Sequence, residues 1–153
     1  MEIEGQIASL YTKDTSTAYA NLQALEALSQ QADTLYPHLG EFIGMLQSGQ
    51  YVVRVRGFRL LCLQARWDRD GVIDREIDAI LAALGDEKPT AVRQMLQYLK
   101  FMLPYKMALY GKIGNAVRAI DLSRFKDTMA PLIMNDMDDL LQAIEAQKKN
   151  EES

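Results

Sequence analysis

The chain has 153 residues, of which 48% are hydrophobic and 25% are charged, values typical of one folded domain with a sizeable core. Its formal net charge of −4 argues against a protein that binds nucleic acid over its whole surface, since such proteins are basic. The single cysteine, Cys62, excludes an internal disulfide and cannot by itself hold a zinc ion or an iron–sulfur cluster.

The N-terminal segment 1–14 opens with acidic residues and lacks the basic region and apolar run of a signal peptide. No apolar run in the chain approaches the roughly 18 residues that a membrane span needs. Together with the single cysteine, these features predict a cytoplasmic protein that makes no membrane contact.

Apolar residues recur at helical spacing along nearly the whole chain, and the period-two pattern of β-strands is missing. The spacing predicts helices over 15–32, 35–49, 48–68, 73–86, 88–103, 106–120 and 124–147. Thr15 or Ser16 is the expected N-cap of the first of these helices. Pro131 predicts a kink or a late start for the last one, and residues 147–153 are expected to form a frayed tail. The expected fold class is all-α, with about seven to eight helices in a single domain over 1–153.

The helical segment 48–68 combines an apolar face with several arginines and a central glycine, Gly57. The residues expected to point inward are Val55, Phe58, Cys62 and Ala65. A glycine inside a helix costs about 1 kcal/mol relative to alanine. Gly57 therefore predicts that another helix approaches closely at this point.

The sequence also repeats itself at a period near 37 residues. Tyr19, Arg56 and Arg93 are each 37 residues apart. The same offset relates four apolar positions, which are Ala18, Val55, Val92 and Met129. Such a period made of helix pairs is typical of an α-solenoid. We expect three full helix pairs, preceded by a partial one that caps the stack.

Three sequence blocks carry a resemblance to known proteins: Val53 to Asp68, Asp86 to Gln94, and Asp121 to Ile133, with Thr128 in a position that the pattern gives to serine. Through these blocks, and through a "VR" pair early in two helices, the chain resembles small bacterial HEAT-like repeat proteins of the ARM/HEAT superfamily. The resemblance implies a short superhelix of helix pairs and a general role in protein contact, with no known catalytic residues to carry over. Some relatives carry an iron–sulfur assembly (SufBD-like) label, which one cysteine and one histidine do not support chemically.

Two sets of arginines have different expected roles. Arg56 and Arg93 share the repeat period, so we expect them to form ion pairs between repeats, with Asp86 or Glu87 as acidic partners. Arg54, Arg59 and Arg66 do not follow the period, and with Arg93, Gln97 and Lys100 alongside they form the expected partner-binding surface. This set is suited to an acidic peptide, a phosphate or a nucleic-acid backbone, and the alternative is an ordinary solvated face.

Other candidate sites favour structural roles. Trp67 at a helix end is read as a lid on the core, against the alternative of a stacking platform beside Asp68, as in a HEAT-like DNA glycosylase. The run from Asp68 to Asp74 fails the calcium-loop pattern in every register. Cys62 reads as core and His38 has no second histidine, so we expect no metal and no cofactor.

The methionines near the C-terminus, Met129, Met134 and Met137, indicate either ordinary packing or an adaptable contact surface. We expect a non-catalytic module that binds a protein partner, without catalytic residues. Binding or processing of nucleic acid through the local arginines is the alternative. An enzyme would require carboxylates such as Asp68 and Asp70 to converge in a pocket.

Overall fold

The computed structural model describes residues 2–152, and over that range the chain is all-α, with eight α-helices and no strand. The helices are α1 (Ile3–Ser9), α2 (Thr15–Gln31), α3 (Leu39–Gly44), α4 (Tyr51–Leu63), α5 (Val72–Ala82), α6 (Pro89–Leu99), α7 (Tyr110–Arg118) and α8 (Ala130–Glu152). Short 3₁₀ turns extend several of them, among them η3 (Gln64–Trp67) after α4 and η5 (Lys100–Met102) after α6. Each predicted helical segment corresponds to one α-helix, although α5 begins one residue before its segment and α8 runs five residues beyond its segment, and α1 adds an eighth helix.

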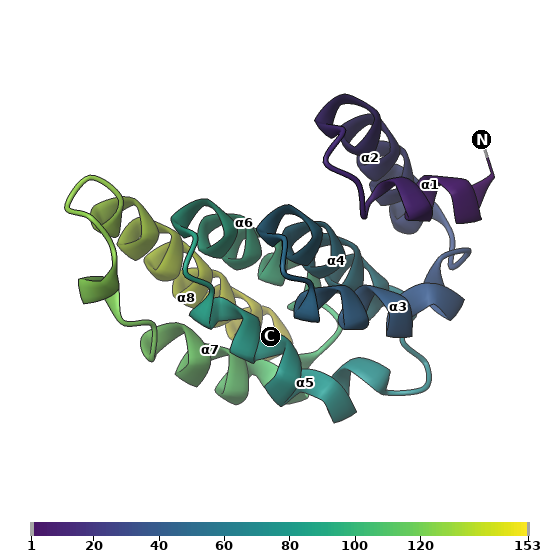
Figure 1. The fold of residues 1–153 in the computed structure, drawn as a ribbon. Coiled ribbons are helices and arrows are strands. Elements are labelled where there is room, and N and C mark those ends of the chain that lie inside the picture. The colour runs from purple at the N-terminus through teal and green to yellow at the C-terminus, as the bar shows by residue number, and fades with distance from the viewer. Residues whose placement is uncertain (1, 153) are drawn as a thin grey trace.

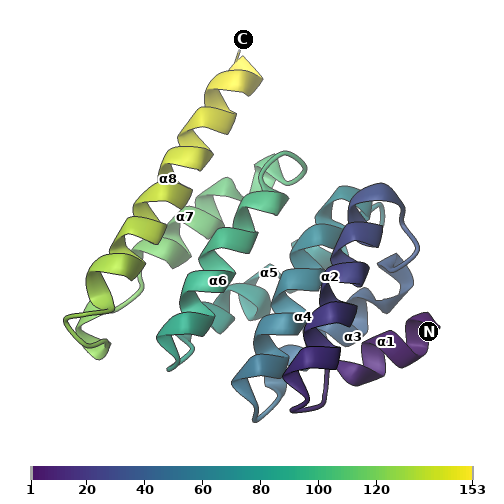
Figure 2. The ribbon, with the colours of Figure 1, turned by 90° about the horizontal axis from the view of Figure 1, so that it is seen from above.

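The helices alternate between two layers in chain order. Seen from above, α2, α4, α6 and α8 lie side by side in one layer (Figure 2). Figure 1 shows α3, α5 and α7 as a row on the other side, with the α1–α2 pair turned away at the N-terminal end. The packing follows the same order, since α4 contacts both α2 and α6, and α6 contacts α8.

The core lies between the two layers and is formed by the apolar face of each helix. The four residues predicted to point inward from segment 48–68 are all buried, namely Val55, Phe58 and Cys62 on α4 and Ala65 in η3. They join a continuous cluster that runs from Ile7 in α1 to Ile144 in α8. One hydrophobic core therefore spans all eight helices.

Gly57 is a point of close approach between α4 and the preceding helical segment. A Cβ atom at this position would lie 2.6 Å from the Phe42 carbonyl oxygen and 2.6 Å from Met45 Cβ. No side chain fits at such distances. The predicted close approach at Gly57 is confirmed.

The structure decides three helix ends for which the sequence gave alternatives or expectations. Asp14, rather than Thr15 or Ser16, caps α2, because its Oδ1 accepts a hydrogen bond of 3.3 Å from the Thr17 N–H. Pro131 lies in the first turn of α8, so the helix starts late and does not kink there. The tail expected at 147–153 is helical as far as Glu152, and the last residue lies outside the described part.

The C-terminal methionines divide between packing and exposure. Met137 is buried and Met129 packs against the core, whereas Met134 is largely exposed on α8. Only Met134 therefore remains available as part of a contact surface.

Cys62 is fully buried, and burial raises the pKa of its thiol well above the usual value. We expect the folded protein to resist thiol reagents such as dithionitrobenzoate, because the reactive species is the exposed thiolate. In denaturant, one thiol per chain should react at the rate of a free cysteine. Rapid stoichiometric labelling of the folded protein would contradict the buried position.

Candidate functional site

The residues predicted to bind a partner lie in the layer of α2, α4, α6 and α8. Arg54 and Arg59 are on α4, Arg66 is in η3, Arg93 and Gln97 are on α6, and Lys100 is in η5. The structure separates them into two kinds. Three of the arginines make ion pairs within the protein, whereas the remaining residues are exposed.

Arg59 joins three helices. Its Nε and Nη2 donate to both carboxylate oxygens of Glu26 on α2, at 2.8 and 2.9 Å. Its Nη1 donates to Gln94 Oε1 on α6 at 2.9 Å, and the guanidinium lies 4.6 Å from the centre of the Tyr98 ring. This bidentate, largely buried contact with Glu26, together with the bond to Gln94, fixes the positions of α2, α4 and α6 relative to one another.

Arg54 is the partner of Asp86, the carboxylate that the sequence assigned to Arg56 or Arg93. Arg54 Nε and Nη2 donate to the two Asp86 oxygens at 2.7 and 3.1 Å, and Nη1 donates to the Ser48 carbonyl at 2.9 Å. Asp86 also accepts from the Lys88 N–H, just before α6. The pair therefore fixes the start of α6 against the start of α4.

The two period-matched arginines behave differently from each other. Arg93 Nε donates to Asp136 on α8 at 2.6 Å, an ion pair between neighbouring helices of the layer. Arg56 makes no ion pair within residues 2–152. Its Nη1 instead donates to the carbonyls of Leu10 and Thr12, at 2.9 and 2.8 Å, just after α1. The ion pair expected for Arg56 is replaced by contacts to the end of a helix.

Arg66, Gln97 and Lys100 are the exposed members of the predicted surface. Arg66 donates to the Gln30 carbonyl at 2.8 Å and stacks over the Trp67 ring. Trp67 packs against the core and donates from Nε1 to the Ser29 carbonyl. This placement agrees with a lid on the core and leaves little of the ring for stacking a ligand.

Four aromatic residues that the sequence reasoning did not select lie around these groups. Tyr19 and Tyr51 line one pocket together with Arg59, and Tyr98 lies beneath the same guanidinium. The ring centres of Tyr98 and Phe101 are 5.3 Å apart. We call this outward side of the layer, defined by Tyr19, Tyr51, Arg59, Tyr98 and Phe101, the α2/α4/α6 face. One of these residues was foreseeable from the sequence. Phe101 stands four residues after Gln97, a member of the predicted surface, and residues four apart lie on the same side of a helix.

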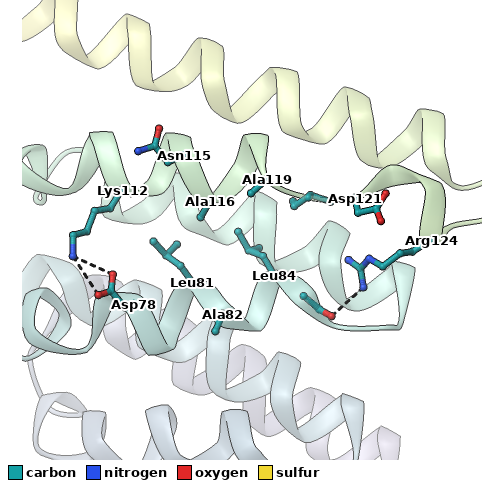
Figure 3. Close-up of a pocket in the computed structure, with 12 residues that line it drawn as sticks. Asp78, Leu81, Ala82, Leu84, Lys112, Asn115, Ala116, Ala119, Asp121 and Arg124 are labelled. Carbon is teal, nitrogen blue, oxygen red and sulfur yellow. Dashed lines mark hydrogen bonds and ion pairs between the residues drawn. The ribbon is translucent and has the colours of Figure 1, made fainter.

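A groove of about 580 Å³ lies in the other layer, between α5 and α7 (Figure 3). Its floor is apolar and includes Leu81 and Leu84. Lys112 pairs with Asp78 at 3.1 Å near one end, and Arg124 donates to the Gly85 carbonyl at the other (Figure 3). The charged groups at both ends of this groove are thus already engaged within the protein.

Asp68 and Asp70 do converge, as an enzyme would require, but on a structural network centred on the buried side chain of Asp68. The Tyr36 hydroxyl lies 2.8 Å from Asp68 Oδ1 and 2.9 Å from Asp70 Oδ2. Lys106 Nζ donates to Asp68 Oδ2 at 2.9 Å and also to Asp74. Asp68 further accepts from the N–H groups of Val72 and Ile73, at the start of α5. The network joins three connections between helices and borders neither the α5/α7 groove nor the α2/α4/α6 face.

The network perturbs its own ionisable groups. Burial alone would raise the pKa of Asp68, but hydrogen bonds from Lys106, Tyr36 and the two N–H groups outweigh it and hold that pKa below the usual value. Burial, together with the hydrogen bond to Asp68, raises the pKa of Tyr36 to about 12. The lowered pKa favours the charged Asp68 carboxylate that pairs with Lys106, and the raised pKa keeps the Tyr36 hydroxyl protonated so that it can donate to Asp68.

Two wider properties hold over residues 2–152. Within that range no three His, Cys, Asp or Glu side chains are placed to hold a metal ion together. No helix of the described chain has the length and apolar character needed to cross a membrane.

Comparison of the chain with models of protein families, with curated proteins and with solved structures finds no match.

Proposed function

We propose that this protein is a non-catalytic interaction module that binds a segment of a partner protein on its α2/α4/α6 face. The proposal includes a HEAT/ARM-like architecture in which helix pairs stack as a short superhelix. The 37-residue period supports that architecture, as does the alternation of the helices between two layers. A single buried cysteine fits a cytoplasmic location.

The observation that carries the proposal is a row of aromatic side chains on a rigid support. Tyr19 is 55% exposed and Phe101 is 40% exposed, whereas large apolar side chains normally lie inside. The Arg59 contacts to Glu26 and Gln94 hold the three helices that carry them. Aromatic residues on a preorganised surface lose little entropy on binding and dominate the energetics of many interfaces.

Nucleic acid fits this face less well than a protein does. Arg54, Arg59 and Arg93 are each neutralised by a carboxylate, which leaves Arg66 and Lys100 as the exposed cations of the predicted set. A phosphate backbone requires a stripe of uncompensated positive charge.

Site-specific photo-crosslinking in the source cells tests the proposal. A benzophenone amino acid replaces Tyr19 or Phe101 on the face, and Glu76 or Ala119 in the other layer as matched exposed controls. We expect the two face positions to capture the same protein and the two controls to capture none. Because these residues are exposed and make no ion pairs, the fold should tolerate the changes, unlike charge reversal at Arg54 or Arg59.

Two outcomes would contradict the proposal. Capture from Ala119 alone would place binding in the α5/α7 groove of Figure 3. Absence of any specific adduct at all four positions, with the protein folded and expressed, would remove the interaction module as an explanation.

A further inference from the structure

A small pocket of about 230 Å³ lies between α2 and α4 on the α2/α4/α6 face, with Gln94 of α6 at its edge. These two helices lie side by side in the layer (Figure 2). Leu22 and Val55 are its buried apolar residues, and Tyr19 and Tyr51 are its exposed aromatic ones. The volume is below the usual range for a whole cofactor or drug-sized ligand and suits one side chain.

Arg56 lines this pocket and carries a charge that the protein does not neutralise. Only 7% of the residue is exposed, and no carboxylate within residues 2–152 forms an ion pair with it. Burial lowers the pKa of its guanidinium, and no acidic neighbour opposes that effect. Arg54, Arg59 and Arg93 each have a carboxylate partner, so Arg56 is the exception among the arginines of α4 and α6. A buried charge without a counter-ion is costly, and an anion would relieve that cost.

The free donors of Arg56 suit an oxyanion. Its Nη1 donates to two backbone carbonyls, while Nε and Nη2 make no hydrogen bond within the described chain and together hold three N–H groups. That edge of a guanidinium matches a carboxylate or phosphate with two parallel hydrogen bonds.

The surroundings of the pocket are also positive. Tyr51 and Val52 line it and are the first two residues of α4, whose N-cap Gln50 makes no side-chain capping bond. The partial positive charge of a helix N-terminus favours an anion. Lys13, Arg54 and Lys88 line the adjoining pocket, and Glu87 is the single acidic residue among its lining residues.

We propose that the pocket between α2 and α4 binds a carboxylate or phosphate group carried on a short apolar or aromatic stem, with Arg56 as the counter-ion. The proposal rests on the proposed function, because such a group would be an anchoring side chain of the partner. Tyr19 and Tyr51 would contact the stem, and the oxyanion would lie against Nε and Nη2 of Arg56.

Titration with small probes, followed by nuclear magnetic resonance, tests the pocket without the partner. Benzoate and phenyl phosphate supply the two oxyanions on an aromatic stem, inorganic phosphate lacks the stem, and benzyl alcohol lacks the charge. We expect benzoate or phenyl phosphate to shift the Arg56 Nε–H and the Tyr51 and Val52 amide signals saturably, with a Kd on the order of 1 mM. Inorganic phosphate should bind more weakly, and benzyl alcohol should leave the Arg56 signal unchanged.

Variants assign the binding to named residues. Arg56→Lys keeps the charge but loses the fork, so the affinity for phenyl phosphate should fall about tenfold. Tyr19→Ala removes an exposed wall of the pocket without touching Arg56, and it should weaken binding even if Arg56 variants fold poorly. Arg75→Gln, an exposed arginine on α5, is the matched control and should change nothing.

The outcomes separate this proposal from the proposed function. Anion-induced shifts spread over surface lysines, with the Arg56 signal unmoved, would overturn the pocket assignment, as would unchanged affinity in both Arg56→Lys and Tyr19→Ala. Specific binding of the probes with no captured partner would overturn the interaction module and leave the anion pocket standing. A captured partner with no probe binding would overturn the anion pocket and leave the interaction module standing.

Discussion

Replacing Lys106 by methionine is expected to lower the free energy of unfolding by about 3 kcal/mol, measured by urea denaturation at neutral pH. The side chain of Asp68 is fully buried, and Lys106 supplies its opposite charge at 2.9 Å. Removal of one partner leaves a buried carboxylate without compensation. Bonds to Asp68 from Tyr36 and two N–H groups place the loss at the lower end of the range for a buried pair.

Lys112→Met is the matched control, because Lys112 pairs with Asp78 where the two side chains are 56% and 82% exposed. Solvent screens that pair, so the change should stay within about 0.5 kcal/mol. The double variant Lys106→Met/Asp68→Asn should be more stable than Lys106→Met alone, because it removes the uncompensated charge. If Lys106→Met and Lys112→Met lose similar stability, the buried network does not hold the fold.

The pH dependence of stability in the wild type and in Lys106→Met gives an independent check. Asp68 has a pKa below its usual value, so its contribution is present at neutral pH and is lost as the pH falls through the depressed folded value. In Lys106→Met the ammonium group of Lys106 no longer opposes the effect of burial on Asp68. The pKa of Asp68 is therefore higher in this variant than in the wild type. The stability gap between the two proteins should therefore narrow below about pH 4. A gap that stays constant down to acid unfolding would mean that Asp68 is not the affected group.

Gly57→Ala is expected to destabilise the protein by about 3 kcal/mol, although alanine is the better helix former by about 1 kcal/mol. The added Cβ would meet the Phe42 carbonyl oxygen and Met45 Cβ, both at 2.6 Å. Neither a backbone oxygen nor a Cβ atom can move aside by rotating a side chain. The α3 segment and α4 would have to separate along a buried contact, which a lower urea midpoint would report.

Gly40→Ala on α3 is the control, since no atom lies within 4 Å of a Cβ added there. It should leave stability unchanged or raise it by up to about 1 kcal/mol, through helix propensity and a less flexible unfolded chain. Equal effects of Gly57→Ala and Gly40→Ala would show that the contact at Gly57 relaxes at little cost.

The core residues illustrate where inference from the sequence succeeds. Helical spacing predicted that Val55, Phe58, Cys62 and Ala65 in segment 48–68 point inward, and all four are buried. The cost of glycine in a helix pointed to the contact at Gly57. Both arguments use neighbours within two or three turns of one helix, where the geometry is nearly constant.

The arginines illustrate where it fails. The sequence treated Arg54 and Arg59 as free contact residues, because their positions do not recur at the 37-residue period. In the structure their carboxylate partners are Asp86 and Glu26, at separations of 32 and 33 residues. The 37-residue period identifies only side chains that recur in successive helix pairs. The Arg54–Asp86 and Arg59–Glu26 pairs involve arginines that do not recur, so the period does not reveal them.

The sequence by itself determined the all-α class and the approximate position of seven of the eight helices, because a 3.6-residue repeat of apolar residues is a local property. Only the tertiary structure decided which arginine finds a carboxylate, which one stays without a counter-ion beside a pocket, and that Asp68, Lys106 and Tyr36 form one network. Those choices depend on how each helix is turned about its axis against its neighbours. A small rotation of a helix about its axis would bring a long side chain to a different partner. The spacing of residues along the chain does not specify that rotation.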